Sequence, residues 1–204
     1  NQVVYARLAA DMDTPVSLML KLADAGKNAF MLESVTGGEV RGRYSIVGFN
    51  PDLIWECRGP TSRVNRNARF DDTSFETLDA DPLTALRGLL AESKINLPAD
   101  LPAACAGLFG YLPNVNPDPL GLPDAMMLRP SVVAVLDGVK GDVILVAPAW
   151  ANSGLSAKAA YAQAAERVMD ATRALDRALP AHRTLADAHE VSPPVSNFSH
   201  ANYL

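Results

Sequence analysis

The sequence has few of the residues that mark common kinds of active site. Its 204 residues include only two cysteines and three histidines. Cys57 and Cys105 stand in no CxxC or Cys/His spacing, so we expect two buried, reduced thiols rather than a disulfide or a metal site. The histidines, His182, His189 and His200, all follow residue 180. The preceding part of the chain therefore has no histidine base for a Ser-His-Asp or Cys-His arrangement.

Clustered positive charge and long apolar runs are also missing. Eighteen basic residues against twenty-three acidic ones give a net charge of -5. This balance argues against binding to nucleic acid or to an anionic membrane surface, because both favour clustered Lys and Arg. No apolar run approaches the roughly 20 residues of a membrane-spanning helix, and no signal peptide is visible at the N-terminus. We expect a cytoplasmic protein.

No phosphate-binding loop is present either. The segment Gly107-Leu108-Phe109-Gly110 lacks the Lys-Ser/Thr ending of a P-loop and the third glycine of a dinucleotide-binding fingerprint. We interpret its glycines as positions of close backbone packing beside the core. On pattern alone, carboxylates such as Glu33, Asp71 and Asp72 are interpreted as solvated loop charge.

The sequence predicts three helices, the first of which Thr14 can cap. The first follows Thr14-Pro15 and ends at Gly26, the second begins at Asp81-Pro82, and the third runs from Ser156 to Pro180. The spacing of apolar residues predicts the buried face of each helix. In the first helix it consists of Val16, Met19, Leu20 and Ala23, and in the second of Leu83, Leu86 and Leu90. In the third it consists of Tyr161, Ala165, Val168, Thr172, Leu175 and Leu179.

The other apolar segments predict strands joined by tight turns. The clearest hairpin joins residues 131–137 and 142–147. Further strands are predicted over residues 3–8, 30–35, 40–49 and 53–58. A glycine turn at residues 36–39 joins the second of these to the third, and a turn at residues 50–52 precedes the fourth. Residues 112–130 contain several prolines and are predicted to be extended or looped. The sum is an α+β fold, an antiparallel β-sheet built from hairpins with packed helices.

The pattern changes after Pro180. Residues 181–196 are polar, contain Pro193-Pro194 and show no periodicity, so they are interpreted as a linker. We divide the chain into an N-terminal domain at residues 1–180, this linker, and residues 197–204.

The most specific stretch runs from Met31 to Gly48 and reads MLESVTGGEVRGRYSIVG. It resembles the signature of anthranilate synthase component I, the large subunit of a tryptophan-biosynthesis enzyme, in which Leu-Glu-Ser precedes Gly-Arg-Tyr-Ser-x-x-Gly. Further segments fit the same family in the same order: Asn50-Pro51, Asp81-Pro82-Leu83, Gly107-x-x-Gly110-Tyr111 and Leu120-Gly121-Leu122-Pro123-Asp124. The resemblance therefore covers nearly the whole chain.

This resemblance implies the N-terminal, regulatory part of an enzyme that converts chorismate to anthranilate. Similar enzymes receive ammonia from a glutamine amidotransferase subunit, component II. Residues 197–204 begin with Asn-Phe after Ser196 and resemble the start of the family's chorismate-binding catalytic domain. The family's catalytic acids and magnesium-binding glutamates lie beyond this point. We therefore expect no catalytic residue, metal ligand or cofactor in the chain itself, which is predicted to be inactive without its own catalytic domain.

The resemblance also implies a feedback site for the end product, L-tryptophan, between the two domains. The family's inhibitor-binding segment and the strand facing it map to Leu32, Glu33, Ser34, Arg43, Tyr44 and Ser45. A tryptophan zwitterion needs oxygen acceptors for its ammonium group and hydroxyl or amide donors for its carboxylate. Glu33 and Ser34 can supply these groups, and apolar positions of the hairpin can face the indole.

The pattern alone leaves structural roles open for the same residues. Ser34 and Ser45 could form a cross-strand hydrogen bond. Arg43 could pair with Glu33 or Glu39.

One departure from the family stands after Gly110-Tyr111. Related sequences usually continue with an Asp and a short helical stretch before a Leu-Pro, whereas Leu112-Pro113 follows directly here. A short segment has been deleted, or a loop is missing from the sequence.

Two other functions are considered. One is the large subunit of aminodeoxychorismate synthase, which typically departs from the Leu-Glu-Ser and Gly-Arg-Tyr-Ser motifs. The other is a stand-alone amino-acid-binding module. Salicylate and isochorismate synthases resemble the catalytic domain more than this one.

Overall fold

The structure is a computed structural model that describes residues 1–23, 28–33, 42–112, 121–151 and 154–179. Its strands are β1 (Gln2–Ala9), β2 (Phe30–Leu32), β3 (Tyr44–Arg58), β4 (Thr61–Asn65), β5 (Glu76–Leu78), β6 (Phe109–Tyr111), β7 (Ala125–Asp137) and β8 (Asp142–Ala149). Its helices are α1 (Pro15–Leu22), α2 (Pro82–Glu92) and α3 (Ala157–Leu175), with one 3-10 turn, η1 (Ala103–Cys105).

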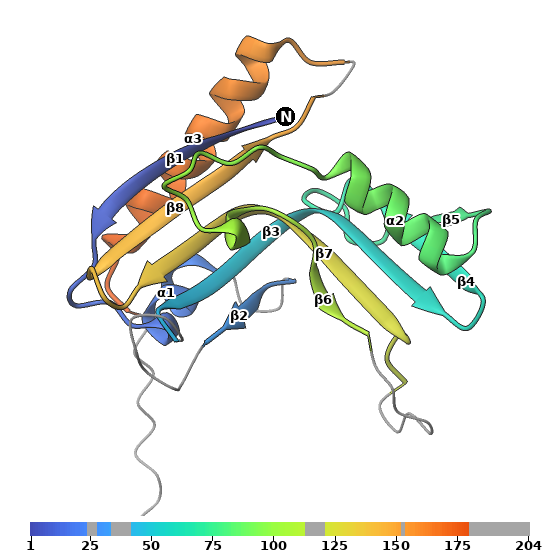
Figure 1. The fold of residues 1–204 in the computed structure, drawn as a ribbon, viewed down its shortest axis with the longest axis horizontal. Coiled ribbons are helices and arrows are strands. Elements are labelled where there is room, and N and C mark those ends of the chain that lie inside the picture. Colours follow the sequence, from blue (N-terminus) through green and yellow to red (C-terminus); the bar gives the residue numbers. More distant parts are fainter. Residues whose placement is uncertain (24–27, 34–41, 113–120, 152–153, 180–204) are drawn as a thin grey trace, which may run out of the picture.

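All strands belong to one antiparallel sheet, which confirms the predicted fold class (Figure 1). The main order is β1-β8-β7-β3-β4-β5, with β2 paired to β3 and β6 paired to β7. The long pair β3 and β7 runs through the middle, from Tyr44 opposite Asp137 to Cys57 opposite Ala125. The predicted pairing of β7 with β8 and of β2 with β3 is confirmed.

The turn predicted at residues 50–52 is wrong, because β3 continues through it as a β-bulge. The register against β7 shifts between Pro51 and Leu53. Asn50 has a φ of 48°, in the left-handed region that asparagine tolerates better than most residues. Pro51 lies opposite Pro130, and neither proline can donate a backbone hydrogen bond to the ladder. The two strands therefore bend here without separating. The span predicted to be extended or looped at residues 112–130 is extended at its end, where β7 begins at Ala125.

The helix starts are confirmed. Thr14, Asp81 and Ser156 each accept a hydrogen bond at the side chain from the backbone N–H three residues on. These are local interactions, and a capping residue followed by proline or by a helix-forming segment is sufficient to predict them. The helices end earlier than predicted: α1 ends at Leu22 and not at Gly26, and α3 ends at Leu175 and not at Pro180.

The buried helix faces agree with the predicted ones only in part. In α1 the buried residues are Ser17, Leu18 and Leu22, whereas Val16 is 52% and Leu20 50% exposed. In α2 the predicted Leu86 is buried, together with Leu89, but Leu83 and Leu90 are exposed. In α3 the predicted Val168 and Leu175 are buried, together with Ala164 and Ala171, but Tyr161 and Leu179 are exposed. The small side chains of Ala164 and Ala171 complete this inner face and let α3 lie close to the sheet.

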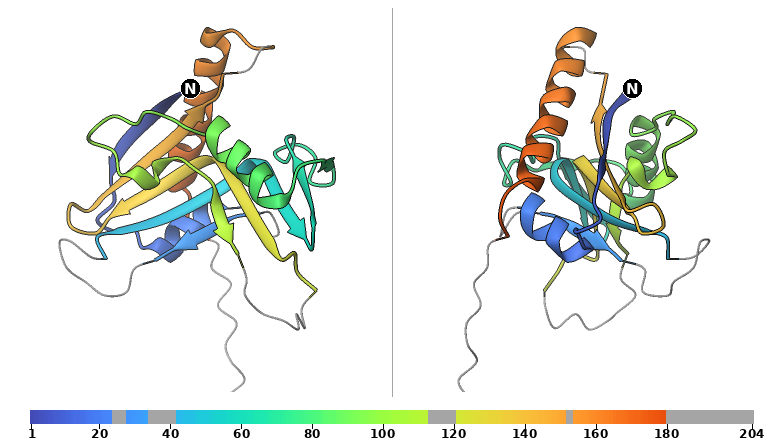
Figure 2. Two further views of the ribbon diagram at one scale, coloured as in Figure 1. Left: turned by 45° about the vertical axis from the view of Figure 1, so that its right-hand side comes forward. Right: turned by 90° about the vertical axis from the view of Figure 1, so that its left-hand side faces the viewer.

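Helices cover both faces of the sheet (Figure 2). α3 and α1 pack on one face of the half formed by β1, β8 and β7, with Leu18 and Val168 in the shared core. The η1 segment packs on the other face of this half through Cys105. α2 covers the second half, where Leu89 and Trp55 share a core. Cys57 and Cys105 are buried free thiols, as predicted, and burial raises the pKa of Cys105 to about 11.

The interpretation of the segment at residues 107–110 as a place of close packing is confirmed at Gly110. This residue lies on β6 opposite Met127, and a Cβ atom added to it would lie 1.8 Å from the carbonyl oxygen of Met126. Backbone atoms cannot yield as a flexible side chain can. Only glycine fits here.

We expect Gly110→Ala to lower the free energy of unfolding by about 1–3 kcal/mol, because β6 must move away from β7 to accept the methyl group. Gly88→Ala is the matched control, since a Cβ there meets nothing within 4 Å. In the middle of α2 it should raise the free energy of unfolding by about 0.5–1 kcal/mol. Urea denaturation followed by circular dichroism measures both, and equal effects would contradict the packing described.

Candidate functional site

The segment predicted to hold the inhibitor lies beside the start of β3. Leu32 pairs with Ile46 in the β2–β3 ladder, so Leu32 and Glu33 are close in space to Tyr44 and Ser45. Leu32 and Glu33 are both exposed, and Tyr44 and Ser45 are half-buried. Ser34 lies outside the described residues, as does the turn at residues 36–39. The five predicted site residues that the structure describes thus lie on or next to one strand pair.

Arg43, the residue just before β3, forms a bidentate ion pair with Asp137 at the end of β7. Its Nε donates to Oδ1 at 2.9 Å and its Nη2 to Oδ2 at 2.6 Å. The Asp137 side chain is 2% exposed and also accepts hydrogen bonds from the backbone N–H groups of Val139 and Lys140. Hydrogen bonds from Arg43, followed by those from this backbone, hold the pKa of Asp137 below its usual value.

This ion pair fixes the strand that faces the predicted inhibitor segment. The guanidinium also lies 5.0 Å from the ring centroid of Tyr44, and the Arg43 carbonyl accepts a hydrogen bond from Gly138 N–H at 2.9 Å. Arg43, Tyr44 and the β7–β8 turn are therefore held as one unit. Sequence reasoning did not identify Asp137 as the partner, because 94 residues separate the two. Glu39, one of the partners considered for Arg43, lies outside the described residues.

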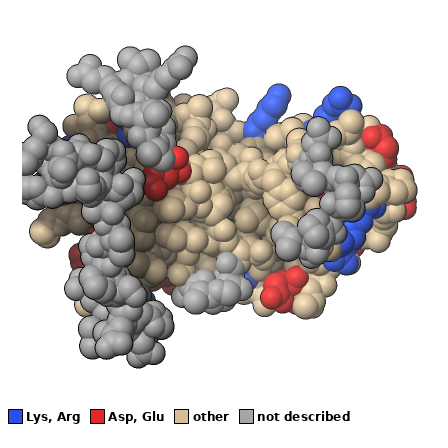
Figure 3. Space-filling model, turned by 90° about the horizontal axis from the view of Figure 1, so that it is seen from below, with Lys and Arg blue, Asp and Glu red and all other residues tan. Residues whose placement is uncertain are grey.

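Uncharged side chains form the surface next to this strand pair. The rings of Phe30 on β2 and Phe109 on β6 stack with centroids 4.6 Å apart. The Phe30 ring lies directly on Gly48, where an added Cβ would come within 2.3 Å of it. Both short strands lie at the lower side of the molecule in Figure 1, and the face seen from that side has little charge at its centre (Figure 3). Leu32 and Leu112 are 51% and 61% exposed.

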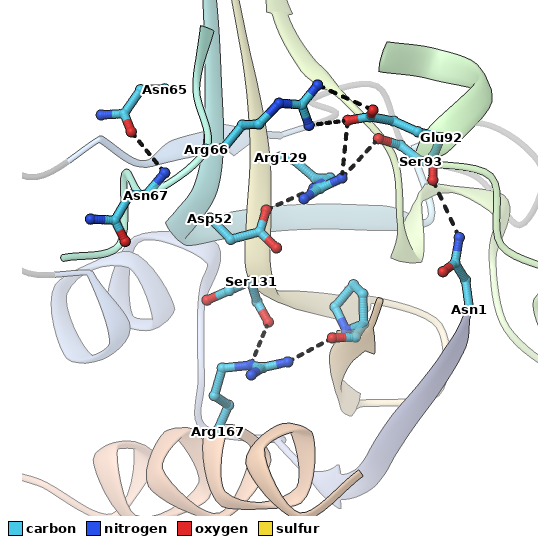
Figure 4. A network of polar contacts seen from close by, with 11 residues as sticks. Asn1, Asp52, Asn65, Arg66, Asn67, Glu92, Ser93, Arg129, Ser131 and Arg167 are labelled. Atoms are coloured by element: carbon cyan, nitrogen blue, oxygen red, sulfur yellow. Dashed lines mark hydrogen bonds and ion pairs between the residues drawn. The ribbon is translucent and has the colours of Figure 1, made fainter. Parts of the chain in front are cut away.

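A second candidate is a polar cleft of about 600 Å³ at the bend of the sheet (Figure 4). Its wall includes Asp52 from the β3 bulge, Arg129 from β7, and Arg167 from α3. One feature of the sequence indicates this cleft. Arg167 falls between Ala164 and Val168 on the buried face of α3, and a charged residue in an apolar stripe is either paired or functional.

The described residues hold no group of three or more His, Cys, Asp or Glu side chains that could bind a metal ion. Within the same part of the chain, no helix is both long and apolar enough to cross a membrane.

Comparison with known proteins gives one consistent result, although no family model matches the chain. Anthranilate synthase component 1 of Cereibacter sphaeroides is 64% identical, covering 100% of this chain and 43% of its own length. The proteins of the same name from Synechocystis sp. and Pseudomonas aeruginosa are 33% and 34% identical over 89% and 78% of this chain. A solved anthranilate synthase component I from Streptococcus pneumoniae matches with a TM-score of 0.47 at 20% identity, covering 82% of this chain and 37% of its own.

The chain is thus homologous to one part of a larger synthase subunit. It belongs to the anthranilate synthase component 1 family and corresponds to the N-terminal portion of that subunit. The chain spans less than half the length of these curated relatives. The alignment with the Cereibacter sphaeroides protein extends over 214 positions against 204 residues here, so at least ten positions of that relative have no counterpart in this chain.

We expect Asp137→Asn to lower the free energy of unfolding at pH 7 by about 1–3 kcal/mol, because it removes the charge that Arg43 faces. The depressed pKa also fixes the pH dependence. The contribution of this pair is fully present above the unfolded-state pKa of about 3.9 and is lost as the pH falls through the lower folded-state pKa.

Urea unfolding at pH 7 and at several pH values below about 4 tests this prediction. Asp137→Asn should flatten the acid-side loss of stability. Asp72→Asn, which changes an exposed carboxylate, should leave the free energy of unfolding at pH 7 and its loss at acid pH nearly unchanged. A wild-type acid profile in the Asp137 variant would show that the pair does not contribute as described.

Proposed function

We propose that this chain is the regulatory N-terminal portion of an enzyme that converts chorismate to anthranilate with ammonia from a glutamine amidotransferase subunit, component II. The observation that carries this proposal is the 64% identity over the whole chain to anthranilate synthase component 1 of Cereibacter sphaeroides. The chorismate chemistry and the magnesium ion it uses would belong to the family's catalytic domain, so no reaction step is assigned to the residues described.

The proposed role of the chain is to bind L-tryptophan as a feedback inhibitor. Glu33 would accept hydrogen bonds from the ammonium group, Ser34 would donate to the carboxylate, and Leu32 would contact the indole. The pairing of Leu32 with Ile46 supports this assignment, because it brings the segment beside the Tyr44 and Ser45 positions of β3. Arg43 would act on this site indirectly, since Asp137 holds its guanidinium and thereby the start of β3.

Inhibition further requires that tryptophan bind one arrangement of the enzyme more tightly than another. The uncharged face bordered by β2 and β6 is the surface we propose for contact with the catalytic domain. An inhibitor held at the edge of this face would touch both parts of the enzyme. Its binding could then favour one domain arrangement.

The alternative functions have less support. Relatives at 64% and at 27% identity bear the same name, anthranilate synthase component 1. Aminodeoxychorismate synthase is therefore not favoured, and neither is a stand-alone amino-acid-binding module.

We expect Ser34→Ala and Glu33→Ala, each made in the full-length enzyme, to raise the tryptophan concentration for half-inhibition by about tenfold or more, which corresponds to the loss of one charged or well-placed hydrogen bond. Anthranilate fluorescence measures the rate in the absence and presence of tryptophan. Glu76→Ala, at an exposed position on β5, is the matched control. Unchanged inhibition in both site variants would exclude the proposed tryptophan contacts.

We also expect the 204-residue chain to self-associate in solution, because an uncharged face that normally packs on another domain is then exposed to water. Sedimentation velocity over a range of concentrations measures this. Leu32→Lys should shift the distribution toward monomer, whereas Tyr161→Lys on α3, where the tyrosine is 60% exposed, should not. A monomer at every concentration would contradict the proposed contact face.

A further inference from the structure

The cleft of about 600 Å³ lies where the two halves of the sheet diverge. On one edge β7 pairs with β6 up to Leu128 and with β8 from Val133 onward. Between Leu128 and Val133, β3 is the only described strand that pairs with β7. The cleft opens at this gap, between α3, the end of β8, the end of α2 and the residues that follow β4.

Both carboxylates of the cleft are already engaged by arginines (Figure 4). Arg129 donates from Nε to Asp52 at 2.7 Å, and its side chain is only 13% exposed. Arg66 holds Glu92 through two hydrogen bonds of 2.7 and 3.2 Å. Desolvation raises the pKa of Asp52 and exceeds the opposing effect of Arg129. These two carboxylates and two arginines therefore largely balance each other in charge.

Two further arginines carry charge that this network does not neutralise. The guanidinium of Arg167 donates to the carbonyl oxygens of Ser131 and Pro148, at 3.2 and 2.6 Å, which orients it without cancelling its charge. Arg69 is exposed at the rim, and its guanidinium lies 5.4 Å from the centroid of the Phe70 ring. Burial, followed by the repulsion of Arg69, lowers the pKa of Arg167. The cleft thus has an excess of positive charge.

The cleft also has hydrogen-bonding atoms without partners in the described part of the chain. Ser131 is 2% exposed, and its Oγ makes no hydrogen bond. The Nε1 of Trp150 is buried and likewise has no acceptor of ordinary geometry, although the indole lies close enough to Asp52 to lower that carboxyl's pKa. Arg129 lies 4.5 Å from the centroid of the Trp150 ring and so holds it in place. Buried polar groups are normally hydrogen-bonded, and an indole N–H can only donate.

We propose that this cleft binds a small anion with a carboxylate or phosphate group. Arg69 and Arg167 supply the positive charge, and Ser131 and Trp150 supply the missing hydrogen bonds. Guanidinium groups suit both kinds of anion because they present paired N–H donors in one plane. The volume lies within the range of small-molecule sites. The cleft shares no residue with the proposed tryptophan site, so either assignment can fail without the other.

The chain contains two tryptophans, Trp55 and Trp150, and this allows a site-specific test by NMR. The full 204-residue chain, labelled with ¹⁵N, gives one indole N–H signal from each, and Trp150→Phe assigns them. Inorganic phosphate and malonate are titrated separately against sodium chloride of equal ionic strength. We expect a saturable shift of the Trp150 signal with at least one of the two anions and no comparable shift of Trp55, which is 1% exposed in a different core. The anion that binds more tightly identifies the preferred group.

Variants distinguish this site from general attraction of anions. Arg69→Ala removes an exposed side chain and should weaken binding by about tenfold. Arg173→Ala is matched in charge and also exposed, but it faces Asp170 on α3 and should have no such effect. The absence of a saturable Trp150 shift with both anions would overturn the proposal. Equal weakening by the two variants would overturn it as well.

Discussion

The antiparallel pairing of β3 with β7 is the contact on which the other elements depend. These two strands run through both halves of the sheet, and the remaining strands attach on either side of them. Each half then has its own core and its own helices, α3 and α1 in one and α2 in the other. The bulge beside Pro51 turns one half relative to the other. Its position therefore decides where the sheet opens into a cleft and which residues line it.

The two candidate sites occupy different positions relative to this bend. The proposed tryptophan site lies near the start of β3 and the end of β7, where Arg43 and Asp137 close the strand pair. The polar cleft lies at the bend itself, where Asp52 and Arg129 face each other from the same two strands. In both places an arginine–aspartate pair crosses from β3, or the residue before it, to β7. The pair of Arg43 and Asp137 fixes a strand that the inhibitor would contact, and the pair of Asp52 and Arg129 forms the floor of the polar cleft.

Features that depend on neighbouring residues could be predicted from the sequence. Thr14, Asp81 and Ser156 mark helix starts because capping acts over three residues, and the β7–β8 hairpin follows from two apolar strands around a glycine turn. Features that depend on distant residues could not. The buried face of α1 depends on its packing against β3 and α3, and the bulge depends on Pro51 meeting Pro130. Arg43 could be named as a site residue from its motif, but its partner Asp137 is 94 residues away. The cleft combines residues from β3, β7, β8 and α3, so no single motif could reveal it.

The meeting of Pro51 and Pro130 also affects how the molecule exchanges hydrogen with water. Neither residue carries an amide hydrogen, and they stand opposite each other in the pair that joins the two halves. The protected amides of β3 and β7 must therefore form two separate blocks, one on each side of the bend. Local opening of one half need not break the β3–β7 hydrogen bonds of the other, so amide protection can differ between the two ends of one continuous sheet.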